Sequence, residues 1–338
     1  MQLTDSWQLG NVQVANRVVL APLAGIGNWF VRLQAKRYGA GLAVSEMVSS
    51  FGLAYGDRRT LNEFLVIDPA EHPVSMQLFG GDPAIMREAA AIVAAAGADV
   101  IDLNMGCPVK KVCKTGAGSA LLGDPDKAVA VAIAACEGSG LPVTVKLRPG
   151  LKPGDREGVV LAQRLVAEAG VAGIAFHPRH SSQQHKGKPD YDLAREVVQL
   201  LPVPVMISGG LLSAQKAQSV FEHTGCAAVM LARGSLGNPW LFQQVLGQRD
   251  DGPSLSEVME ELRWLTGCAE QHFGEKRAAR YLRKFYPWYL DRFRAADDAV
   301  FTRTVVNQLN QQLQRTSTLD AALELFSQAA AAPIASAA

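Results

Sequence analysis

The chain has 338 residues, of which 48% are apolar and 19% are charged, and its formal net charge is +1. This composition supports a large buried core and excludes a disordered chain, and no run approaches the ~18 apolar residues of a membrane span. The N-terminal residues lack a basic segment followed by an apolar one, so we expect no secretory signal and a cytoplasmic protein. The five cysteines, scattered along the chain, favour reduced thiols over a disulfide framework.

Short β-branched segments alternate with alanine-rich segments of helical spacing through the first two thirds of the chain. In order, the eight strand-like segments are 17–25, 42–47, 74–79, 99–106, 142–150, 173–179, 203–210 and 227–234. Strands that are apolar throughout and alternate with helices form a covered parallel sheet, and eight of them predict a (β/α)8 TIM barrel. A doubly wound sheet is the alternative, although the turn after the first segment imitates its glycine-rich fingerprint poorly.

The character of the sequence changes after the last strand-like segment. Residues 247–257 form a polar linker with glycine and proline, and Ser254 and Ser256 are its candidate N-caps. Because no strand-like run follows, we predict a TIM-barrel catalytic domain over 1–246 and a small all-α domain over 255–328. Residues 329–338 are expected to form a disordered tail.

In TIM barrels the catalytic and binding residues lie at the carboxyl ends of the strands. Gly209 and Gly210 end the seventh segment and Arg233 lies at the end of the eighth, which predicts an anion site where backbone N–H groups approach a phosphate. The alternative is that these glycines only turn the chain. With Lys146 and Gln77 at two other corners, the set suits FMN, because Lys146 could stabilise the negative charge of a reduced flavin.

Cys107 and Cys113 flank Lys110 and Lys111 directly after the fourth strand-like segment. Zinc needs four ligands at recurrent spacing, and this pair has no matching second pair, so we expect no metal site. A proton donor must keep its proton, as a free thiol mostly does at neutral pH. The two lysines would lower the pKa of the Cys107 thiol and a nearby anionic flavin would raise it, so the balance stays open.

Several motifs together resemble the tRNA-dihydrouridine synthases, most closely their bacterial B-type branch. Between about residues 7 and 290 they read APLAG, VSEM, VSMQLFGGDP, LNMGCPVKKVCKTGAGSALL, VTVKLRPG, HPR and ARGSLGNPWLF. The resemblance implies an NADPH-driven oxidoreductase that acts on a carbon–carbon bond of tRNA uridine. It implies that reduced FMN passes hydride to uracil C6 and that Cys107 protonates C5.

The resemblance also implies which residues hold each group. The implied flavin contacts are Pro22, Leu23, Ala24, Gln77, Lys146, His177, Ser208, Gly209, Gly210, Ala232 and Arg233. The expected substrate contacts are Asn104, Lys110, Lys111, Arg179, Arg280, Arg283 and Lys284. The chain departs from the family pattern at Leu23, Gly27, Asn28, Pro178, His180, Ser208 and Ala232.

The segment 275–294 carries seven basic and two acidic residues, interleaved with aromatic ones. Tyr281, Phe285 and Trp288 share one helical stripe and predict core, whereas the basic residues fall on other faces. A solvated basic face is the ordinary interpretation, but in a flavin protein it also suits tRNA phosphates. A small-molecule flavin reductase of the same fold and a tRNA-binding protein without turnover are the alternatives. We expect a monomer.

Overall fold

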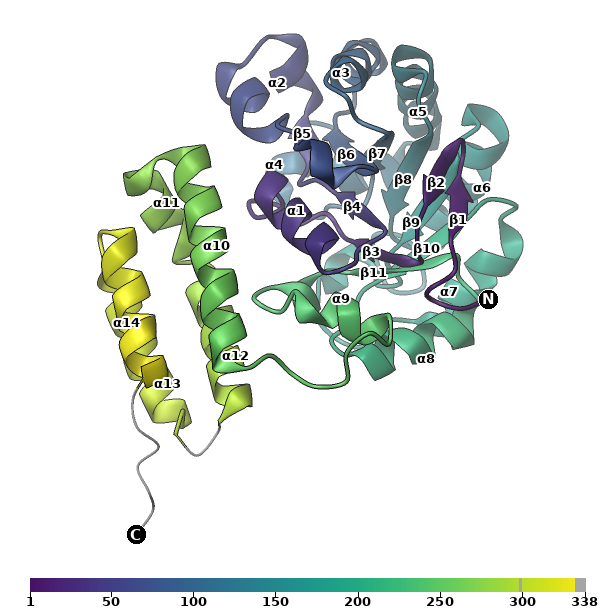
Figure 1. Cartoon of the computed structure of the whole chain (residues 1–338). Coiled ribbons are helices and arrows are strands. Elements are labelled where there is room, and N and C mark those ends of the chain that lie inside the picture. The colour runs from purple at the N-terminus through teal and green to yellow at the C-terminus, as the bar shows by residue number, and fades with distance from the viewer. Residues whose placement is uncertain (298–299, 332–338) are drawn as a thin grey trace. The chain divides into compact units, whose positions relative to one another are not determined.

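A computed structural model of the chain describes residues 1–297 and 300–331. The chain separates into two compact units, Met1–Gly234 and a second that begins at Ser235 (Figure 1). Among the described residues, no helix combines the length and the apolar character that crossing a bilayer requires.

The first unit is a closed parallel barrel. Its strands are β3 (Val18–Leu20), β4 (Leu42–Val44), β6 (Val74–Phe79), β7 (Val100–Asn104), β8 (Val143–Leu147), β9 (Gly173–Phe176), β10 (Val205–Ser208) and β11 (Ala228–Leu231). The β11–β3 and β4–β6 pairings close the ring. The eight predicted strands and the TIM barrel are therefore confirmed.

Helices surround the barrel on its outside (Figure 1). They are α1 (Trp29–Arg37), α3 (Pro83–Ala95), α5 (Pro125–Ser139), α6 (Glu157–Ala169), α7 (Tyr191–Leu200) and α8 (Ala214–Thr224). Most begin at a side-chain cap, as at Asp82 and Asp124, each of which precedes a proline in the first turn. In α3, buried Met86, Ala89 and Val93 form the stripe that faces the sheet.

Shorter elements complete the first unit at its two ends. A hairpin of β1 (Trp7–Leu9) and β2 (Val12–Val14), which the sequence did not predict, contributes Trp7, Leu9 and Val14 to the core cluster that contains strand residues such as Leu42. The others are β5 (Val48–Ser49), α2 (Ser50–Ala54), α4 (Lys110–Cys113), a π-helical turn at Thr60–Phe64, and 3₁₀ turns at Pro69–Glu71, Gly118–Gly123, Ser181–Gln183 and Arg233–Ser235.

In the described residues of the second unit, the regular elements are helices. Its helices are α9 (Trp240–Val245), α10 (Leu255–Phe273), α11 (Glu275–Leu282), α12 (Tyr286–Ala296), α13 (Arg303–Arg315) and α14 (Leu319–Ala331). Ser254 begins α10 with a capping box to Glu257, as one of the two candidate caps predicted. Residues 329–331 of the expected tail belong to α14, and residues 332–338 lie outside the described residues.

Aromatic side chains form much of the core of this helical unit. Phe326 of α14 meets Phe293 with ring centroids 5.5 Å apart and Tyr286 at 5.7 Å. The predicted stripe packs as a continuous row, since Phe285 lies 5.3 Å from both Tyr281 and Trp288. Packing of these rings explains why a chain segment rich in charge still folds as a compact bundle.

Candidate active site

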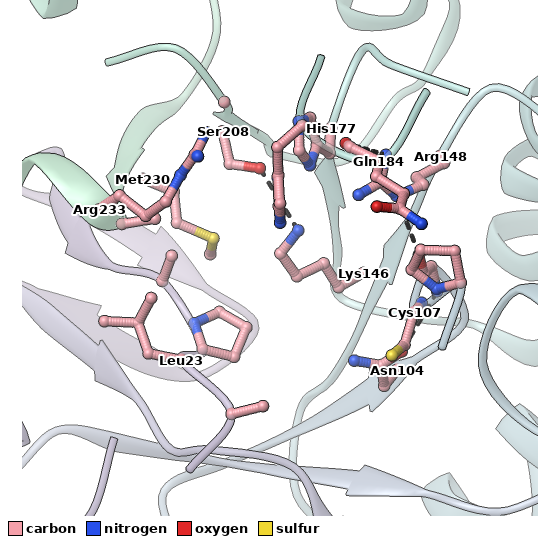
Figure 2. Close-up of a pocket in the computed structure, with 18 of the residues that line it drawn as sticks. Leu23, Asn104, Cys107, Lys146, Arg148, His177, Gln184, Ser208, Met230 and Arg233 are labelled. Atoms are coloured by element: carbon pink, nitrogen blue, oxygen red, sulfur yellow. Dashed lines mark hydrogen bonds between the residues drawn. The ribbon is translucent and has the colours of Figure 1, made fainter. Parts of the chain in front are cut away.

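A cavity of about 510 Å³ opens at the carboxyl ends of the barrel strands, a size within the usual range for a small-molecule site. Figure 2 shows Lys146 reaching into its middle, with Cys107 and Asn104 on one side and Met230 and Arg233 on the opposite side. The predicted residues that line it are Pro22, Leu23, Ala24, Gln77, Asn104, Cys107, Lys146, His177, Ser208, Gly209, Gly210, Ala232 and Arg233. The structure therefore brings together every predicted flavin contact.

Asn104 holds the loop that carries the thiol. Its Oδ1 accepts hydrogen bonds from the backbone N–H groups of Cys107 at 2.9 Å and Gly106 at 3.3 Å. From the other side, Arg148 Nε donates to the Gly106 carbonyl at 2.9 Å. Cys107 is half-buried, and this burial raises the pKa of its thiol above the ordinary value, so the side chain keeps its proton at neutral pH.

A buried carboxylate lies beneath this loop and was not singled out in the sequence. Asp102 Oδ1 accepts from the Thr144 hydroxyl, and Oδ2 accepts from Gln77 Nε2, both at 2.6 Å. Gln77 Oε1 in turn accepts from Asn104 Nδ2 at 2.9 Å. These bonds fix the orientation of both amides, because each amide can satisfy its partners in only one of its two flipped orientations. In that orientation Asn104 turns its Oδ1 to the Cys107 loop. Burial raises the pKa of Asp102 above its ordinary value, while its hydrogen bonds from Thr144 and Gln77 and the charge of Lys146 oppose that rise.

Lys146 and His177 differ in charge. Lys146 Nζ lies 3.3 Å from Ser208 Oγ. Burial and the charge of Arg148 lower the pKa of Lys146 to about 8, although the charge of Asp102 opposes this shift. The ammonium form of Lys146 therefore persists at neutral pH. Burial, followed by the nearby charges of Lys146 and Arg148, lowers the pKa of His177 far below its ordinary value. The site therefore combines a cationic amine with a neutral imidazole.

The glycines after β10 are required by close contacts. Gly209 has a φ of +101°, and a Cβ there would lie 2.6 Å from the His177 ring. Gly210 has a φ of +77°, and its Cβ would lie 2.8 Å from the Tyr191 hydroxyl, which itself donates to the Gly209 carbonyl at 2.8 Å. Only glycine accepts both this conformation and this proximity, so backbone is exposed to the cavity next to Arg233.

The family model described as Dihydrouridine synthase (Dus) matches residues 19–329. The chain belongs to the dihydrouridine synthase family. A tRNA-dihydrouridine synthase B of Pseudomonas aeruginosa is 37% identical over 290 residues, which cover 84% of this chain and 86% of that protein. A tRNA-dihydrouridine synthase B of Shewanella oneidensis is 35% identical over 319 residues, or 93% of this chain and 97% of that protein. The resemblance drawn from the motifs is confirmed.

Solved structures support the fold of this dihydrouridine synthase family member. Morphinone reductase matches with a TM-score of 0.54 and 16% identity, covering 76% of this chain and 92% of that one. A 2-naphthoyl-CoA reductase complex matches with a TM-score of 0.58 and 14% identity, covering 73% and 52%. At such identity the likeness concerns the barrel fold alone.

Some cavity residues of this family member could not be expected from sequence. Gln184 and His185, on the loop after β9, line the mouth, and Gln184 has a left-handed φ of +52°. Arg148 Nη1 holds this loop through the carbonyls of Gln184 at 3.0 Å and Arg179 at 3.1 Å. Other lining residues that the prediction omitted include Met47, Leu211, Leu212 and Met230. Arg148 and Met47 carried a signal in the sequence, since each lies at or near the end of a strand-like segment.

The predicted substrate contacts of the first unit lie in different settings. Lys110 and Lys111 are exposed on α4, immediately after the Cys107 loop. Arg179 is buried: its Nε and Nη2 donate to the Gly187 carbonyl at 3.2 and 3.0 Å, and its Nη1 lies 3.2 Å from His177 Nε2. Through these contacts Arg179 holds in place the loop that contains Gly187 and the imidazole of His177. In the part of the chain that the structure describes, no group of three or more His, Cys, Asp or Glu is arranged to hold a metal ion.

Proposed function

We propose that this protein reduces uridine in tRNA to dihydrouridine with FMN as its bound cofactor and NADPH as reductant. One observation carries the proposal: the thiol of Cys107, whose pKa is raised by burial, lines a cavity of small-molecule size in a chain of the dihydrouridine synthase family. Its relatives are named for the same reaction on tRNA. We also propose that it acts in the cytoplasm, where its five free cysteines would stay reduced.

The residues that line the cavity fit FMN. Backbone at Gly209 and Gly210, with the Arg233 guanidinium, suits the phosphate, and Lys146 suits the negative charge of a reduced ring. When bound and reduced, FMN supplies the hydride that uracil C6 receives. Cys107 holds the proton for C5, and Asn104 fixes the loop that presents it.

The proposed flavin site predicts that the purified protein is yellow and that Gly209→Ala weakens FMN binding about tenfold or more. The new methyl group would displace the His177 ring and narrow the cradle. Gly97→Ala is a matched control, because Gly97 has a φ of +98° but nothing within 4 Å of its Cβ position. Titration of flavin fluorescence measures both affinities. Folded wild-type protein that takes up no FMN would refute the cofactor assignment.

The helical unit is proposed to bind tRNA phosphates through exposed basic residues. Lys276, Arg277 and Arg280 are exposed on α11, and Lys284 is exposed just after it. Arg283, also predicted as a contact, is half-buried and donates from Nη2 to the Thr316 carbonyl at 2.7 Å. Replacing Arg283 would therefore disturb the bundle as well as the basic surface, so the test uses its exposed neighbours.

Arg280→Ala combined with Lys284→Ala is expected to raise the KM for tRNA and to flatten its salt dependence. Each phosphate contact contributes a log–log slope of about 0.7 to 0.9, so two lost contacts remove about 1.4 to 1.8. The control pair is Arg303→Ala with Arg315→Ala, two exposed positions on α13. If the test pair and the wild type show the same slope of log KM against log salt concentration, the surface that binds tRNA lies elsewhere on the protein.

A further inference from the structure

Exposed apolar side chains concentrate at the mouth of the barrel. Among the residues that the structure describes, nine large apolar side chains are exposed, and more than half lie on segments that follow the carboxyl ends of barrel strands. These five are Phe51, Tyr55, Val109, Leu151 and Leu212. Apolar surface gathered on one functional face marks a contact surface more often than single scattered residues do.

Phe51 and Tyr55 are the two aromatic members of this set. Their rings stack at 6.0 Å with an interplanar angle of 17°, and Tyr55 is 75% exposed. They lie on and just after α2, which follows β5, and β5 pairs with Leu78 and Phe79 at the end of β6. Met47, directly before β5, lines the cavity, and Ser50 at the start of α2 lies against Gly80, which follows the carboxyl end of β6. The start of α2 therefore lies at the carboxyl ends of the strands, on the face that we call the rim.

Basic residues lie on the neighbouring part of the rim. A Cβ at Gly80 would collide with Ser50 at the start of α2, and a Cβ at Gly81 would lie 2.5 Å from the Gly116 carbonyl, just beyond α4. One loop thus packs against both segments. The α4 segment exposes Lys110, Lys111 and, directly after it, Lys114. The rim therefore combines stacked aromatic rings with three exposed ammonium groups.

Resting on the function proposed above, we propose that Phe51 and Tyr55 form a stacking platform for an unpaired tRNA base beside the target uridine. A uridine that reaches Cys107 must leave the base stack, and its neighbours then lose a stacking partner. Exposed aromatic rings replace such a partner for any base, because every base has a π-face. The α4 lysines lie where they can neutralise the adjoining phosphates.

The test compares loss of stacking with loss of charge. Phe51→Ala combined with Tyr55→Ala should raise the KM for tRNA about tenfold or more, by the same factor at every salt concentration. Lys110→Ala combined with Lys111→Ala should instead flatten the salt dependence. Tyr55→Trp should retain wild-type KM, because it keeps a π-face. Val160→Ala with Leu200→Ala, exposed apolar positions on α6 and α7, is the control pair.

NADPH oxidation by the flavin should be unchanged in the aromatic variants, since their side chains do not line the cavity. A wild-type KM in the double variant at every salt concentration overturns the platform, as does a KM change accompanied by a flatter slope. Light scattering that shows loss of a dimer, with tRNA kinetics unchanged, would assign the rings to contact between copies. Failure of the proposed function is separate: the wild type itself would then form no dihydrouridine in tRNA.

Discussion

Cys107→Ala is expected to lower the rate of tRNA uridine reduction about 10²-fold or more, while FMN binding and flavin reduction by NADPH stay nearly intact. The thiol would act only after hydride transfer, so its removal leaves the earlier half-reaction untouched. Single-turnover measurement of dihydrouridine formation, alongside stopped-flow measurement of flavin reduction, separates the two steps.

The pH dependence gives a second measure of the same thiol. Donation requires the protonated form, which is present below the thiol pKa and lost as the pH rises through it. Because burial raises that pKa above the ordinary value of a thiol, wild-type activity should keep its thiol-dependent part at neutral pH and lose it only in alkaline solution. Cys113→Ala is the control, since Cys113 does not line the cavity and its Sγ makes weak contacts to the Cys107 carbonyl at 3.4 Å and the Ser119 hydroxyl at 3.5 Å. Equal activity of Cys107→Ala and the wild type would remove the proposed proton donor.

Lys146→Met is expected to slow flavin reduction about 10²-fold, because it removes the cation placed to stabilise the charge of the reduced ring. The pKa of Lys146 is about 8, so the free protein loses the ammonium as the pH rises through that value. The wild-type affinity for reduced FMN should therefore fall above about pH 8. In the Lys146→Met protein this fall in affinity above about pH 8 should be absent.

Lys36→Met is a matched control for that experiment. Burial also lowers the pKa of Lys36 to about 8, but the side chain lies on α1 and donates to the Gly41 carbonyl at 3.0 Å. This control should keep the wild-type profile for FMN affinity. If both variants lose the pH dependence of FMN affinity to the same extent, that dependence is a general property of the fold. If the Lys146→Met protein keeps the wild-type pH dependence and rate of flavin reduction, the proposed role of the cation is wrong.

The composition of the site followed from sequence because barrel geometry is strict. Parallel strands place their carboxyl ends at one mouth, so Gln77, Asn104, Lys146 and Ser208 had to meet once the strand-like segments were recognised. Local chemistry was equally predictable where the partners are close in sequence. The cap at Ser254 is an example, because its partner Glu257 lies three residues away.

The sequence by itself thus determined the barrel, the helical unit, the family and many of the side chains that face the cavity. Only the tertiary structure decided the state and support of those side chains. Asp102 orients Gln77 across 25 residues, and Arg148 holds the Gln184 loop across 36. The Arg283 guanidinium donates a hydrogen bond to the carbonyl of Thr316, which is 33 residues away. Burial, which sets the pKa of Cys107, is likewise a property of the packed molecule, because it depends on neighbours that are distant in sequence.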